Sequence, residues 1–171
     1  TVPTATSATA RRPGSPAERS AAGAAAPILV LMDISGSMDE SDGTTRADGS
    51  TRTKIEGARI GANAFLGGLP DNATVGLRTY PKGGCDGGQV RIPVARLDRG
   101  RMGAEVRSLR SNGGGTPTGP ALTAAAADLR GAGFATGTIV LVSDGESNCG
   151  NDPCDVAKAL AKQGIDVTIN T

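Results

Sequence analysis

The chain has 171 residues with a net charge of +1, and its length predicts one domain rather than two. Its 18 Lys and Arg residues are balanced by 17 Asp and Glu, and it has one Tyr, two Phe and no Trp. It therefore lacks both the positive field and the stacking surface that nucleic-acid binding needs. The sequence contains no His, which excludes a Ser-His-Asp triad, a Cys-His pair and an HExxH zinc site.

The first part of the chain, residues 1–26, is rich in Thr, Ala, Ser, Pro, Gly and Arg and has almost no large apolar side chain. We expect a flexible tail or linker, because such a composition cannot offset the entropy cost of ordering. The chain starts without a Met or an apolar signal core, which indicates a mature or trimmed end. The longest apolar stretch, residues 24–32, is too short for a membrane helix and contains Pro27, so no transmembrane segment is expected.

Apolar periodicity then predicts strands that alternate with helices. Residues 28–32 and 138–142 are continuous apolar runs, typical of strands buried on both faces. Thr53 and Glu56 form a capping-box pattern at the start of the first helix. In chain order we expect a strand over 28–32, a helix over 53–69, a strand over 74–80, an edge strand over 90–94, helices over 102–109 and 118–131, a strand over 138–142, a helix over 152–164 and a strand over 165–169. This alternation predicts an α/β fold with a mostly parallel sheet and helices on both faces.

The three cysteines, Cys85, Cys149 and Cys154, predict one intrachain disulfide and one remaining thiol. We expect the pair Cys149–Cys154, because the Gly- and Pro-containing residues between them allow the chain to fold back. Cys85 lies in a Gly-rich loop, where it would either pair with a segment outside this chain or stay a free exposed thiol. The alternative is three reduced thiols, as in a cytosolic protein.

Polar sequences with small side chains follow both buried strands. Asp33-Ile34-Ser35-Gly36-Ser37 comes after the first and Ser143-Asp144-Gly145 after the later one, and a Gly-rich loop over residues 113–119 lies between them. The carboxyl ends of parallel strands form binding sites in open α/β sheets, and two carboxylates with several hydroxyls suit Mg²⁺ or Mn²⁺. Each piece alone also fits a turn or a helix cap, so the metal interpretation depends on their combination.

The polar stretch over residues 38–43 is a weaker candidate for a second cation site. Its spacing matches no EF-hand pattern, so we expect a solvated loop there.

The combined pattern resembles the metal-ion-dependent adhesion site (MIDAS) of von Willebrand factor A domains. The matching pieces are D-x-S-x-S at residues 33–37, Thr116 in a TPTG loop and Asp144 in a strand-ending S-D-G, and the resemblance covers about residues 27–171. It implies a three-layer Rossmann-like sandwich with one antiparallel edge strand at residues 90–94, and a last helix and strand that would follow Thr171. It also implies that Ser35 and Ser37 ligate a metal ion through their hydroxyls, and that Thr116 supplies a third oxygen when ligand is bound. Asp33 and Asp144 would act through metal-bound water or balance the charge.

The function that this resemblance implies is non-catalytic binding of a protein ligand. We expect a Mg²⁺-dependent adhesion or binding module, with Mn²⁺ or Ca²⁺ as alternatives, whose ligand completes the metal coordination with an acidic residue. The expected setting is extracytoplasmic, on the surface of or secreted by a bacterium, and the Arg and Ala bias of the sequence fits a high-GC genome.

Two other functions compete with this one. An intracellular A domain that works with an ATPase in metal insertion or complex remodelling would share the site but keep its cysteines reduced. An enzyme using Mg²⁺ for phosphoryl transfer is disfavoured, because the sequence has no GxxxxGK[ST] loop and has Ser35 where an Asp-x-Asp nucleophile motif needs its second Asp.

Overall fold

The computed structural model describes residues 25–81, 84–145 and 147–170. Its elements in chain order are β1 (Ile28–Asp33), the 3-10 helix η1 (Gly36–Asp39), β2 (Ser41–Thr45), β3 (Thr51–Thr53), α2 (Lys54–Gly68), β4 (Thr74–Tyr80), β5 (Gln89–Arg96), α3 (Arg99–Ser108), α4 (Thr118–Gly131), β6 (Gly137–Val142), α5 (Pro153–Ala161) and β7 (Ile165–Asn170). The expected flexible tail at residues 1–26 lies almost entirely outside the described residues. The domain limits, including a last helix and strand beyond Thr171, stay a prediction.

A five-stranded sheet in the order β5-β4-β1-β6-β7 forms the centre of the fold. Strands β4, β1, β6 and β7 pair in parallel, and β5 pairs antiparallel with β4 at the edge. The register places Asp33 opposite Tyr80, and Met32 opposite both Thr79 and Val142, so β1, β4 and β6 end at nearly the same level. The mostly parallel sheet with one antiparallel edge strand confirms the predicted fold class.

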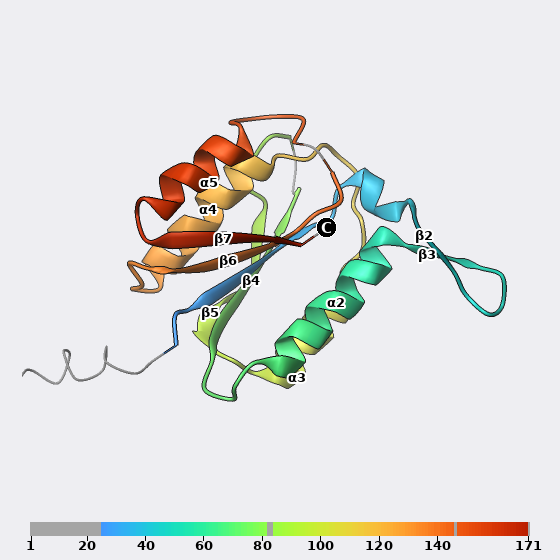
Figure 1. Ribbon diagram of the computed structural model, residues 1–171, viewed down its shortest axis with the longest axis horizontal. Coiled ribbons are helices and arrows are strands. Elements are labelled where there is room, and N and C mark those ends of the chain that lie inside the picture. The colour runs from blue at the N-terminus through green and yellow to red at the C-terminus, as the bar shows by residue number, and fades with distance from the viewer. Residues whose placement is uncertain (1–24, 82–83, 146, 171) are drawn as a thin grey trace, which may run out of the picture.

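Helices cover both faces of this sheet, with α4 and α5 on one side and α2 and α3 on the other (Figure 1). Alternate side chains of β1 serve the two faces, because successive residues of a strand point to opposite sides. Leu29 and Leu31 pack in the core under α4 and α5, whereas Val30 and Met32 pack in the core under α2 and α3. Burial on both faces explains why β1 reads as an unbroken apolar run.

The region after Ser37 differs from the expected solvated loop. Residues 36–39 form η1, and β2 and β3 pair as an antiparallel hairpin that projects from the body of the domain (Figure 1). Arg46 N donates to Ser50 O at 2.8 Å, and Gly49 has a φ of +82° at the tip. The sequence did not predict this hairpin, because its strands do not alternate apolar and polar residues. The pair Asp48-Gly49 is nevertheless a strong signal for a hairpin turn.

The described helices are short. The longest of them, α2, has 15 residues, whereas a membrane-spanning helix needs about 20 apolar residues. Within the described residues, no helix is both long and apolar enough to cross a membrane.

Candidate metal centre

The two polar motifs and the Gly-rich loop meet at the carboxyl edge of the sheet. Strands β1 and β6 are neighbours, so the sequences that follow them start side by side. Asn112 N donates to Ile34 O at 3.0 Å, and Ser111 Oγ donates to Ser35 O at 2.8 Å, which holds the segment before α4 against the first motif. The two segments pack against each other, since a methyl group on Gly36 would be at an ordinary van der Waals distance of 3.6 Å from the Gly113 Cα. The topology therefore assembles segments that are far apart in the sequence.

Asp33, the last residue of β1, is fully buried. Its Oδ1 accepts a hydrogen bond from Ser35 N at 2.8 Å, and its Oδ2 accepts one from Ser143 Oγ at 2.7 Å. Burial raises the pKa of this carboxyl above its usual value, and the hydrogen bonds from Ser143 and Ser35 only partly oppose that shift. In the part of the chain that the structure describes, Asp33 forms no ion pair with a basic side chain. A buried carboxylate balanced only by neutral donors is a favourable place for a cation.

Ser35, Ser37 and Asp144 form a connected row of oxygens beside Asp33. The hydroxyls of Ser35 and Ser37 lie 3.2 Å apart, and Ser37 Oγ donates to Asp144 Oδ1 at 3.0 Å. Ser35 is buried and Asp144 nearly so, with 12% of its side chain exposed. The structure thus brings four of the expected site residues into one network, in which the bond between Ser37 and Asp144 spans 107 positions of sequence.

Lys54 is a member of this cluster that the sequence did not reveal. It is the first residue of α2, and its Nζ donates to Asp144 Oδ2 at 2.7 Å and to Glu40 Oε2 at 2.8 Å. The hydrogen bond to Asp144, followed by the one to Glu40, raises the pKa of Lys54 above its usual value. The site therefore contains a fixed positive charge of its own.

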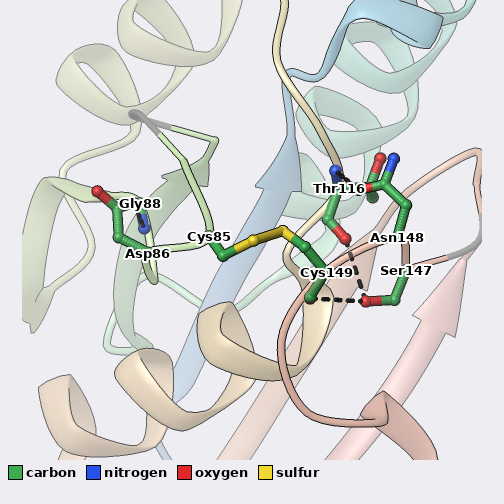
Figure 2. The surroundings of a disulfide bond; sticks show 7 residues. All are labelled: Cys85, Asp86, Gly88, Thr116, Ser147, Asn148 and Cys149. Atoms are coloured by element: carbon green, nitrogen blue, oxygen red, sulfur yellow. Dashed lines mark hydrogen bonds between the residues drawn. A yellow bond between two sulfur atoms is a disulfide. The ribbon is translucent and has the colours of Figure 1, made fainter.

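Thr116 is held through its backbone by the loop that follows Asp144. Figure 2 shows how Ser147 and Asn148 hold it: Thr116 N donates to Asn148 Oδ1 at 2.7 Å, Asn148 N donates to Thr116 O at 3.2 Å, and Ser147 Oγ donates to the same carbonyl at 3.1 Å. The side chain is 5% exposed. Its hydroxyl makes no hydrogen bond to another described residue, so this oxygen stays unused within that part of the protein. Among the described residues, Thr116 makes no hydrogen bond to the hydroxyl of Ser35 or Ser37.

The expected disulfide Cys149–Cys154 is wrong, because Cys149 pairs with Cys85 instead (Figure 2). The Cα atoms of the bonded pair are 5.7 Å apart although 64 positions separate them in sequence. Cys154 is held in the first turn of α5, where its backbone N donates to the capping carboxylate of Asp152 at 2.8 Å, and its thiol is free and exposed. Strands β4 and β6 flank β1, so the loops after them meet at one edge, which brings Cys85 to Cys149.

The donor set fits a small, hard divalent cation. The cluster offers two carboxylates and two adjacent serine hydroxyls, with no nitrogen or sulfur ligand among these residues. Oxygen-only sites of this kind suit Mg²⁺, Mn²⁺ or Ca²⁺ rather than softer metals. Among the described residues, no group of three or more His, Cys, Asp or Glu side chains converges, so a metal site here requires the hydroxyls.

The fold and the cluster define a Rossmann-like α/β domain that carries an oxygen-rich site at the carboxyl edge of its parallel strands. Residues 28–146 match the von Willebrand factor type A domain, well over half of the chain, and the chain belongs to that family.

Known proteins similar to this chain include one bacterial sequence and two solved structures. The uncharacterized protein YwmC of Bacillus subtilis (strain 168) is 28% identical over 173 residues, covering 92% of this chain and 71% of YwmC. An aerotolerance-related membrane protein of Bacteroides fragilis NCTC 9343 has a TM-score of 0.68 at 22% identity, over 85% of this chain and 66% of that one. Proximal thread matrix protein 1 of the mussel byssus, with a zinc-occupied MIDAS motif, has a TM-score of 0.66 at 17% identity, over 85% of this chain and 37% of that one. At these identities the two structures establish a shared fold, and this chain spans only part of each.

Proposed function

We propose that this chain is a non-catalytic, divalent-cation-dependent protein-binding module. Asp33, Ser35, Ser37, Thr116 and Asp144 would hold Mg²⁺, with Mn²⁺ or Ca²⁺ as alternatives. The observation that carries the proposal is the fully buried Asp33, which has only neutral hydrogen-bond donors, beside the connected oxygens of Ser35, Ser37 and Asp144.

Each of these residues has a separate task in the proposed site. Ser35 and Ser37 present neutral hydroxyl oxygens from the short segment after β1. The Thr116 hydroxyl, which has no hydrogen-bond partner among the described residues, would be a further ligand. Asp33 keeps both oxygens in hydrogen bonds, so it balances charge from a fixed position. When bound, the metal ion would supply an open coordination position for a carboxylate of the partner protein.

The relatives and the disulfide support this proposal and its setting. The mussel protein carries zinc in a MIDAS motif, on the same fold as this chain. The Cys85–Cys149 disulfide favours an oxidising, extracytoplasmic compartment over the intracellular alternative, in which the thiols would be reduced. The relative from Bacillus subtilis agrees with a bacterial origin.

The test is the thermal and chemical stability of the full chain with Mg²⁺ or with EDTA. A ligand at 100 times its dissociation constant stabilises a protein by about 2.7 kcal/mol, so millimolar Mg²⁺ should raise the melting temperature of the wild type. Asp144→Ala and the double variant Ser35→Ala/Ser37→Ala should lose this response, whereas Ser108→Ala, an exposed serine of α3, should keep it. A wild type without a Mg²⁺ response, or an unchanged response in both site variants, would refute the metal site. The binding function would then be tested by using the chain to capture surface proteins with and without EDTA. EDTA should abolish the capture.

A further inference from the structure

The ammonium group of Lys54 lies between the carboxylates of Asp144 and Glu40. Its Nζ lies 2.7 Å from Asp144 Oδ2 and 2.8 Å from Glu40 Oε2. Only 27% of the Lys54 side chain is exposed, and Asp144 is the less exposed of its two partners, at 12% against 68% for Glu40. The stronger of the two pairs is therefore the one with Asp144, since screening by solvent weakens an exposed pair.

A lysine is an unfavourable residue for the start of a helix. The amino end of a helix carries partial positive charge, so a cation in the first turn is destabilising. The start of α2 already has a capping box, in which Glu56 Oε2 accepts from Thr53 N at 2.9 Å, and nothing in this arrangement requires a basic residue at position 54. Residues that are unfavourable for the local structure, such as a cation in the first turn of a helix, are expected where the side chain serves a functional site.

The two oxygens of Asp144 face different groups. Oδ1 accepts from the Ser37 hydroxyl at 3.0 Å, whereas Oδ2 accepts from Lys54. The ammonium of Lys54 already neutralises part of the negative charge of Asp144. A cation held at Ser37 would therefore share this carboxylate with Lys54 and be repelled by the ammonium. The hydrogen bond also keeps Oδ2 turned toward α2.

We infer that Lys54 is a built-in counter-cation that lowers and sets the affinity of the Ser35–Ser37–Asp144 cluster for a divalent cation. The inference rests on the proposed metal-binding function and deepens it. By neutralising Asp144 in part, Lys54 leaves more of the positive charge at the site available to an acidic group of the partner. Glu40 acts in the opposite direction, because it draws the ammonium partly away from Asp144.

Isothermal titration of the full chain with MgCl₂, and separately with MnCl₂, tests the inference. Lys54→Met, which keeps the length of the side chain and removes the charge, should bind both ions about tenfold more tightly, as expected for removing one repelling charge at short range. Lys54→Arg keeps the charge and should stay within about threefold of the wild type. Glu40→Gln should weaken binding by about threefold, a smaller change because Glu40 is exposed.

The opposite directions of Lys54→Met and Glu40→Gln separate an electrostatic role from a structural one, since a variant that only loosened the site would weaken binding in both cases. Urea unfolding in EDTA confirms that each variant folds. If Lys54→Met does not fold, Glu40→Gln still tests the inference. Unchanged or weaker affinity in Lys54→Met, or tighter affinity in Glu40→Gln, would overturn the inference while the metal site of the wild type stands. A wild type that binds neither ion would instead overturn the proposed function.

Discussion

Ser143 donates a hydrogen bond to Asp33 at 2.7 Å, between two buried side chains that lie 110 positions apart in the sequence. The bond crosses from the end of β6 to the end of β1 and satisfies the Asp33 oxygen that Ser35 does not reach. Asp33 is thereby held in one orientation under the loop that carries the two serines.

Replacing Ser143 by Ala should destabilise the protein by about 1–3 kcal/mol, the cost of leaving a buried charged acceptor without its partner. Ser143→Thr keeps the hydroxyl and should recover most of the loss. Urea unfolding in EDTA measures both variants. A Ser143→Ala protein as stable as the wild type would mean that this bond does not hold Asp33.

Asp33→Asn should make the metal-free protein more stable at neutral pH and remove its response to Mg²⁺. The raised pKa of Asp33 means that the folded state favours the protonated carboxyl. Its favourable contribution is therefore fully present below the ordinary pKa of 3.8 and is lost as the pH rises through the raised value. An amide avoids this loss, because it carries no charge at any of these pH values.

The measurement is the free energy of unfolding of the metal-free wild type and Asp33→Asn at several pH values between 4 and 7. The advantage of the variant should grow with pH. A variant that is less stable than the wild type at pH 7 without metal would contradict this account of the buried charge.

The Cys85–Cys149 disulfide should contribute substantially to stability. For a sequence separation of 64, the chain-entropy relation gives about 4 kcal/mol, so Cys85→Ser/Cys149→Ser should lose an amount of this order. Cys154→Ser is the matched control and should change little, because that thiol is free and exposed. Alkylation of the folded wild type should modify one thiol. Modification of Cys85 or Cys149 in the folded, non-reduced protein would show that the pair is not bonded.

An ion pair also fixes the helix that follows the Thr116 loop. Arg78 of β4 donates to both carboxylate oxygens of Asp128 of α4, at 2.6 and 2.9 Å, and to the carbonyl of Gly87 at 2.7 Å. Asp128→Ala would leave a largely buried guanidinium unpaired and should cost about 3 kcal/mol. The control is Asp155→Ala, whose pair with Lys158 is exposed and should contribute little. Equal effects of the two variants on urea unfolding would contradict this difference.

Local patterns were sufficient to predict the main elements of the fold. The continuous apolar runs at residues 28–32 and 138–142 became β1 and β6, because strands in the centre of a parallel sheet are buried on both faces. The Thr53–Glu56 capping box starts α2 as expected. The β2–β3 hairpin was missed, since strands of Ser, Thr, Asp and Arg carry no hydrophobic alternation.

The parts of the site that the sequence did not reveal depend on which strands are neighbours. The disulfide partner of Cys149 is set by the order β4-β1-β6, and the short separation of Cys149 and Cys154 was misleading. Lys54 is one charged residue among many until the fold places its Nζ beside Asp144. By contrast, the motif itself was sufficient to predict that Asp33, Ser35 and Ser37 lie close together, because they are near neighbours in the sequence. Their role as metal ligands stays a prediction.

The β2–β3 hairpin affects whether the protein aggregates at high concentration. A two-stranded ribbon leaves backbone amide and carbonyl groups free along its outer edges, which is the usual template for sheet-to-sheet aggregation. Between Ser41 and Thr53, however, Ala47 is the only apolar side chain, and charged and hydroxyl groups line the rest. Self-association through this hairpin would have to bury those polar groups. We therefore expect the hairpin to stay exposed to solvent next to Asp144 and Lys54.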